Sequence, residues 1–94
     1  MPSRVRLSSL ASRDLACQRA YMTQPGAGRI AAKKLAALLM QLGGLPDQEQ
    51  LYPEDRRKPG YRVAIVADFV IQFRRDAAGN IFVRRIFGPG QDRK

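Results

Sequence analysis

Residues 61–87 read YRVAIVADFVIQFRRDAAGNIFVRRIF, and apolar side chains occupy alternate positions through most of this stretch. Such alternation is typical of β-strands, because successive side chains point to opposite faces of a sheet. The apolar rows are Tyr61, Val63 and Ile65, then Phe69, Ile71 and Phe73, and lastly Ile81, Val83 and Phe87. Residues 76–80, DAAGN, have the composition of a hairpin loop. The stretch therefore predicts a three-stranded antiparallel meander.

Upstream of the meander, residues 27–42 show the period of an amphipathic helix. Its apolar stripe consists of Ala31, Leu35, Leu38 and Leu42, broadened by Leu39. Gly43-Gly44 predicts the end of this helix, because glycine readily adopts the left-handed conformation of a cap. Residues 45–60, which are rich in proline and charge, then predict a long surface connection.

A first helix is predicted ahead of this one. Ser8 or Ser9 can cap it, and the apolar residues Ala11, Leu15 and Met22 follow at helical spacing. Residues 23–26, TQPG, break it before the second helix begins, so the two helices should form an antiparallel hairpin. Residues 4–7 alternate charged and apolar side chains, which indicates a short strand. The whole predicts a single α+β domain over residues 1–94, with the helical hairpin covering the meander.

The composition points to a basic protein with an anionic partner. The 94 residues carry a formal net charge of +9. Residues 1–55 hold seven Lys/Arg against five Asp/Glu, and residues 56–94 hold ten against three, so the second half carries most of the surplus. Such a field attracts nucleic acid, anionic membrane or an acidic protein. A single cysteine and the lack of a long apolar run favour a soluble protein of the cytoplasm.

The inventory of reactive side chains argues against common catalytic sites. The chain has no histidine, so no Ser-His, Cys-His or His-metal arrangement is possible. Cys17 lies within the first predicted helix without a candidate base, which favours a structural role. The carboxylates of the second half are too scattered to suggest a pair or a metal cluster. We therefore predict no catalytic residue, no metal, no cofactor and no small-molecule substrate.

The element order and several motifs resemble the RelE/ParE toxin superfamily. In the helical half, Ser8, Ala11, Asp14 and Leu15 resemble the S-x-x-A-x-x-D-L start of the first helix in ParE-like toxins. Tyr21 stands where these toxins often have a tyrosine. Pro25 and Ala27 resemble the N-P-x-A start of their second helix, although Gln24 replaces the asparagine.

The sheet half carries the more specific motifs. Gly60-Tyr61-Arg62 resembles the family's entry to the first meander strand, and Val70, Ile71 and Arg75 resemble its V-I-x-x-x-R strand. Arg85-Ile86-Phe87, followed by Asp92, resembles the terminal R-(V/I)-L-H-x-x-x-D segment. Phe87 replaces the leucine of that segment and Gly88 the histidine, which puts any role of the histidine in doubt.

This resemblance implies the toxin of a type II toxin-antitoxin system. ParE-like toxins poison DNA gyrase by binding it, and a ParD-like antitoxin neutralises them. RelE-like toxins instead cut messenger RNA on the ribosome, which requires proton transfer besides phosphate neutralisation. The missing histidine favours the ParE branch, with the RelE-like endoribonuclease as the alternative. A non-catalytic basic nucleic-acid-binding module is a third interpretation.

Three groups of residues are predicted to form the functional surfaces. The predicted target contacts are Arg84, Arg85, Phe87, Gln91 and Asp92. The predicted antitoxin contacts are Leu35, Leu38 and Leu42, beside which an acidic antitoxin tail would lie. The predicted basic surface consists of Arg62, Arg74 and Arg75.

Overall fold

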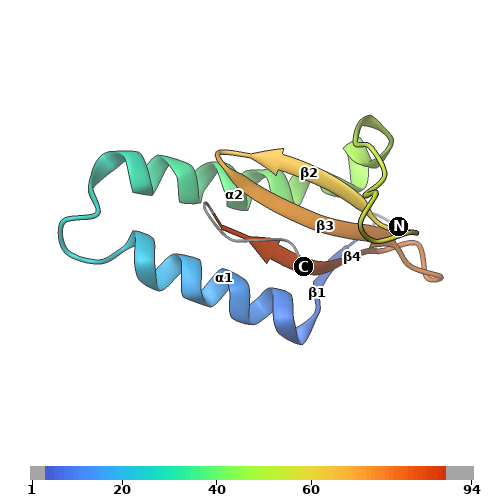
Figure 1. Ribbon diagram of the computed structural model, residues 1–94, viewed down its shortest axis with the longest axis horizontal. Helices are drawn as coiled ribbons and strands as arrows, with labels where there is room; N and C mark the ends of the chain where they lie inside the picture. The colour runs from blue at the N-terminus through green and yellow to red at the C-terminus, as the bar shows by residue number, and fades with distance from the viewer. Residues whose placement is uncertain (1–3, 89–94) are drawn as a thin grey trace.

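The computed structural model describes residues 4–88 and has the predicted α+β architecture (Figure 1). Its elements are β1 (Val5–Leu7), α1 (Ser9–Met22), α2 (Gly28–Gln48), the short 3-10 helix η1 (Glu49–Leu51), β2 (Arg62–Val66), β3 (Phe69–Arg75) and β4 (Ile81–Phe87). The order of strand, helical hairpin and meander is therefore confirmed. None of the helices within this part of the chain is long and apolar enough to cross a membrane.

The four strands form one mixed sheet in the order β1-β4-β3-β2. Strands β2, β3 and β4 are antiparallel neighbours, as the meander predicts. Strand β1 pairs in parallel with the first half of β4, from Val5 opposite Ile81 to Leu7 opposite Val83. The parallel pair arises because the hairpin of α1 and α2 returns the chain to the far edge of the sheet (Figure 1).

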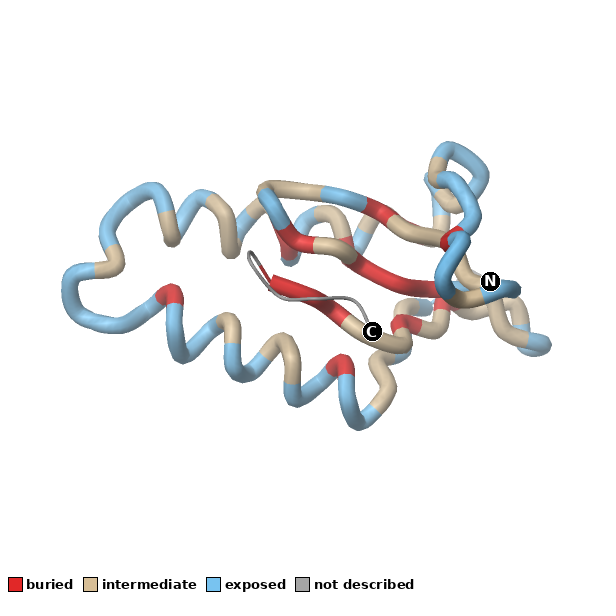
Figure 2. The backbone as a smooth tube through the Cα atoms, in the orientation of Figure 1, coloured by how far each residue is buried: buried red, intermediate tan, exposed pale blue. Residues whose placement is uncertain are grey.

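One face of the sheet packs against the helices and forms the core (Figure 2). Its largest fully buried side chains are Phe69, Phe73, Leu38, Leu45, Ile71, Ile81, Ile86 and Val83. The opposite face, which we call the outer face, carries the side chains between these positions. The predicted rows of β3 and the start of β4 are thus correct.

The predicted inward row of β2 is wrong. Ala64 is fully buried, whereas Ile65 is 73% exposed. Ala64 lies opposite Ile71 in the register, and residues directly opposite each other project from the same face. The row of Tyr61, Val63 and Ile65 therefore lies on the outer face. Five apolar residues in succession, at positions 63–67, leave the phase of this short strand ambiguous in the sequence.

Helix α2 does not end at Gly43-Gly44, as the sequence predicts, but continues to Gln48 with Pro46 inside it. Leu45 is fully buried against the sheet, and this burial stabilises the extra turn of the helix. Neither glycine has a positive φ, so neither forms a left-handed cap. The predicted 45–60 connection is correspondingly shorter, and the irregular segment that remains, residues 52–61, is called the 52–61 loop below.

Replacing Gly43 with alanine should raise the free energy of unfolding by about 1 kcal/mol, because alanine loses less backbone entropy in a helix interior. A Cβ at this position would meet no atom within 4 Å. Urea denaturation followed by circular dichroism measures the change. Gly79→Ala is the control: Gly79 has φ +85°, so alanine there should destabilise the protein. If Gly43→Ala is destabilising instead, the helix ends where the sequence predicts.

Candidate target and partner surfaces

The second half of β4 has no neighbouring strand on one side, and α1 supplies the missing hydrogen bonds. Strand β1 pairs with β4 only as far as Val83. Beyond this point the Ser8 hydroxyl donates to the Arg84 carbonyl oxygen at 2.6 Å, and the Ile86 amide donates to Asp14 Oδ2 at 2.9 Å. Ser8 also caps α1 by accepting from the Ala11 amide at 2.9 Å, which confirms the first of the two predicted caps.

Asp14 also binds the side chain of Arg85, the first residue of the terminal sequence motif. Arg85 Nε donates to Asp14 Oδ2 at 2.8 Å, and Arg85 Nη2 donates to Asp14 Oδ1 at 3.0 Å. This bidentate geometry gives strong, charge-assisted bonds. The hydrogen bond to Asp14 raises the pKa of the Arg85 guanidinium, against the opposing effect of burial and with the carboxylate charge adding to it. Arg85 therefore stays charged at physiological pH. We call this set of contacts the Asp14–Arg85 clasp.

Contacts within the protein reduce the accessible surface of the predicted target contacts. The Arg85 side chain is 27% exposed, and its guanidinium carbon lies 4.8 Å from the centroid of the Phe87 ring. Phe87 itself is only 4% exposed. Arg84 is half-buried on the outer face, where its Nη1 donates to Gln72 Oε1 at 2.6 Å. Gln91 and Asp92 lie outside the described residues. The structure thus brings Arg85 and Phe87 together but leaves them little accessible surface.

The predicted basic surface divides between the two faces of the sheet. Arg62 Nη1 donates to the Tyr52 carbonyl oxygen at 2.6 Å, which ties β2 to the start of the 52–61 loop. Arg75 forms an ion pair with Glu49 at 3.1 Å and also donates to the Pro46 carbonyl oxygen at 3.0 Å. Both arginines therefore hold the segment that leads out of α2. Of the three predicted basic residues, Arg74 alone is exposed, and it lies on the outer face.

The leucines predicted to contact an antitoxin are mostly part of the core. Leu38 is fully buried and Leu42 is 7% exposed, while Leu35 is partly buried against the same core. The stripe faces the sheet because the helical hairpin needs its apolar side to cover it. Within the described residues, these three leucines therefore offer a partner little accessible surface.

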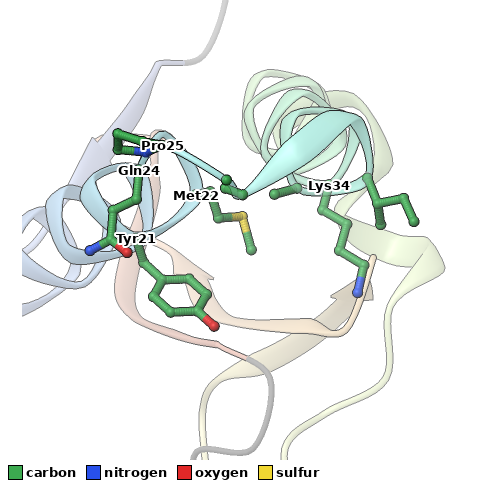
Figure 3. Close-up of a pocket in the computed structure, with 9 residues that line it drawn as sticks. Tyr21, Met22, Gln24, Pro25 and Lys34 are labelled. Carbon is green, nitrogen blue, oxygen red and sulfur yellow. The ribbon is translucent and has the colours of Figure 1, made fainter.

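A cavity does open elsewhere, at the tip of the helical hairpin (Figure 3). Its volume is about 540 Å³, and its lining comes from the end of α1, the 23–27 connection and the start of α2. Tyr21 and Ile30 at its rim are 68% and 73% exposed. Figure 3 shows the Tyr21 ring, the Met22 side chain and the Lys34 ammonium around this space. We call it the hairpin-tip cavity.

Sequence reasoning missed this cavity for a specific reason. Ile30 lies one position before Ala31, so helical periodicity places it off the buried stripe. A large apolar side chain that periodicity places on the exposed side of a helix is the sequence signal that could have indicated the site. Lys34 adds positive charge to the rim and forms an ion pair with Asp68 of the β2–β3 turn at 2.9 Å. The site therefore offers apolar contact beside an ammonium group that is paired with a carboxylate.

Comparisons with known proteins give matches that cover nearly the whole chain. Residues 5–93 match the family model of the ParE toxin of type II toxin-antitoxin systems, parDE. No curated protein sequence matches the chain. A solved structure described as the chromosomal ParDE toxin-antitoxin system from P. aeruginosa is similar, with a TM-score of 0.72 and 20% identity over 94% of this chain and 97% of that chain.

A second similar structure is that of the RelBE2 toxin-antitoxin complex from Mycobacterium tuberculosis. It has a TM-score of 0.66 and 22% identity over 94% of this chain and 99% of that chain. At such identities the two structures support the fold alone. The family model spans nearly all of the chain, so its match is evidence for the family of the protein as well as for its fold.

Proposed function

Because the chain belongs to the ParE toxin family of type II toxin-antitoxin systems, we propose that it arrests growth by binding DNA gyrase in the cytoplasm. An acidic ParD-like antitoxin would neutralise it. The observation that carries the non-catalytic proposal is the lack of histidine, since a ribonuclease needs a general base to activate the ribose hydroxyl. Three of the sheet arginines, Arg62, Arg75 and Arg85, donate to backbone carbonyls and to carboxylates of this same chain, so they hold its fold.

The proposed antitoxin partner is supported by charge and by surface. The net charge of +9 favours an acidic partner. The two similar solved structures are both described as toxin-antitoxin systems or complexes. On this chain the hairpin-tip cavity provides exposed apolar side chains together with Lys34. We place the antitoxin there, in place of the buried leucine stripe.

The alternative function is a ribosome-dependent endoribonuclease, the activity that the resemblance to the RelE branch implies. The two functions make different demands on the chain. Binding of gyrase requires a complementary surface, whereas cleavage of messenger RNA requires a general base near the ribose hydroxyl. The chain contains no histidine to supply that base.

Inducing the full chain in growing bacteria should produce gyrase-dependent double-strand breaks and leave messenger RNA intact. A chain without residues 88–94 should cause neither the breaks nor growth arrest, because we expect the terminal segment, including Gln91 and Asp92, to contact the target. Pulsed-field electrophoresis detects the breaks, and primer extension on ribosome-bound messages detects cleavage.

A strain with a toxin-free plasmid gives the background, and antitoxin co-expression should suppress the breaks. Codon-positioned messenger cleavage without DNA breaks would contradict the gyrase proposal and favour the endoribonuclease. Full growth arrest by the truncated chain, at equal expression, would instead show that the target-contacting surface lies within residues 1–87.

A further inference from the structure

The arginines of the sheet fall into two classes, which differ in whether the side chain is paired with a carboxylate. Arg75 and Arg85 are paired with the carboxylates of Glu49 and Asp14. Arg74 and Arg84, on the outer face, are held by uncharged groups instead. From this contrast we propose that the outer face of the sheet, together with the 52–61 loop, binds the phosphate backbone of double-stranded DNA. This activity is additional to gyrase binding and does not depend on it.

Arg74 and Arg84 are positioned without being neutralised. The guanidinium carbon of Arg74 lies 5.7 Å from the centroid of the Tyr61 ring and 5.4 Å from that of Phe82. Arg84 uses Nη1 to donate to Gln72 at 2.6 Å. Among residues 4–88, neither arginine has a carboxylate within 4.0 Å. Both guanidinium groups therefore keep their full charge and further N–H donors for an external anion.

The 52–61 loop brings more cations to the same face. Its anchor is Asp55, which is only 4% exposed and accepts from Gln72 Nε2 at 2.6 Å and from the Arg57 amide at 2.9 Å. The Asp55 amide also donates to the Tyr61 carbonyl oxygen at 2.8 Å. Gln72 thus joins the loop anchor on one side to Arg84 on the other.

This anchor holds the loop tip next to the outer face. Arg56 is exposed and Lys58 is half-buried, and neither forms an ion pair within the described part of the chain. Arg74 and Arg84 on the outer face, and Arg56 and Lys58 in the anchored loop, are therefore four cations without an ion pair among the described residues, and we call them the cation cluster. One carboxylate, that of Glu54, lines the same hollow as Tyr61 and Arg74. Arginine-rich surfaces of this kind suit phosphate, whose oxygens accept bidentate hydrogen bonds.

The surface fits nucleic acid better than an acidic protein. Protein interfaces are built around buried apolar anchors, whereas nucleic-acid interfaces are polar and strongly positive. Of the large exposed apolar residues, Ile65 lies on the outer face, but toward the opposite end of β2 from Tyr61. The cation cluster therefore lacks a large exposed apolar side chain, and the Tyr61 and Phe82 rings beside Arg74 are half-buried.

The aromatic side chains of the cluster indicate a duplex over a single strand. Single-strand binding relies on bases that stack on free aromatic faces. Here the Tyr61 and Phe82 rings already contact the Arg74 guanidinium. In a duplex the bases stack on one another and only the phosphates need a partner. The expected binding is thus independent of base sequence and strongly dependent on salt.

The test is the double variant Arg74→Gln/Arg84→Gln in the purified full chain. Fluorescence anisotropy with a labelled DNA duplex of arbitrary sequence, titrated between about 50 and 200 mM salt, gives the Kd and its salt dependence. We expect the Kd to rise about 10-fold and the slope of log K against log salt to become less negative by about two, since each phosphate contact contributes about one.

The matched control is Arg29→Gln/Lys33→Gln, which removes the same charge from exposed positions of α2. It should change the Kd by less than about twofold, and circular dichroism should show both variants folded. Equal weakening by the two pairs would reduce the effect to net charge and overturn the proposal. So would absence of duplex binding by the wild type, tighter binding of single-stranded DNA, or equal competition by polyglutamate. None of these results depends on gyrase.

Discussion

Replacing Asp14 with alanine should lower the free energy of unfolding by about 3 kcal/mol. The Asp14 carboxylate accepts two hydrogen bonds from Arg85 and one from the Ile86 amide. Alanine would leave a half-buried guanidinium without its counter-ion and a strand amide without an acceptor. The Arg85 side chain retains 27% exposure, so water compensates for part of the loss. Urea denaturation monitored by circular dichroism measures the difference.

Two further variants separate the parts of the clasp. Asp14→Asn keeps an acceptor for the Ile86 amide but loses the charge, so its loss of stability should be smaller. Asp47→Ala, which removes an exposed carboxylate from α2, is the matched control and should change stability by less than about 0.5 kcal/mol. If Asp14→Ala costs no more than Asp47→Ala, the clasp does not stabilise the end of β4.

The fold was largely predictable because its periodic signals are strong. The alternation in β3 and the stripe of α2 each repeat over several residues, and the structure confirms both. The errors lie where a local signal competes with burial. Gly43-Gly44 favours a helix end, but the burial of Leu45 extends α2 past it. A contact between segments distant in the sequence determines where α2 ends, and hydrophobic periodicity carries no information about such contacts.

The candidate site was less predictable, and the arginines show why. Arg74, Arg75, Arg84 and Arg85 form two adjacent pairs that look equivalent in the sequence. The fold gives one member of each pair a carboxylate and leaves the other on the outer face. Strand alternation explains the split at β3. At β4 a bulge opposite the step from Gln72 to Phe73 sets Arg85 opposite Gln72, and Arg85 reaches Asp14 of α1 where β4 has no neighbouring strand. Sequence alone reveals neither the bulge nor this contact.

The two proposed surfaces lie on different elements of the fold. The hairpin-tip cavity is formed by α1, α2 and their connection, whereas the cation cluster belongs to β3, β4 and the 52–61 loop. A partner in the cavity would not have to cover the cations. Variants of the cavity should therefore alter antitoxin affinity while leaving the outer face unchanged, so the two proposals can be tested separately.

Replacing Ile30 with glutamate should weaken antitoxin binding at least about 100-fold, or roughly 3 kcal/mol. The change removes an apolar anchor at the rim of the cavity and places a negative charge against an acidic partner. Ile30 is 73% exposed, so folding should be unaffected. Isothermal titration calorimetry with the proposed ParD-like antitoxin measures the Kd. Met40→Glu, with the same charge change at an 80% exposed position of α2, should alter it less than about threefold. Equal affinities for the Ile30 and Met40 variants would exclude the cavity as the antitoxin site.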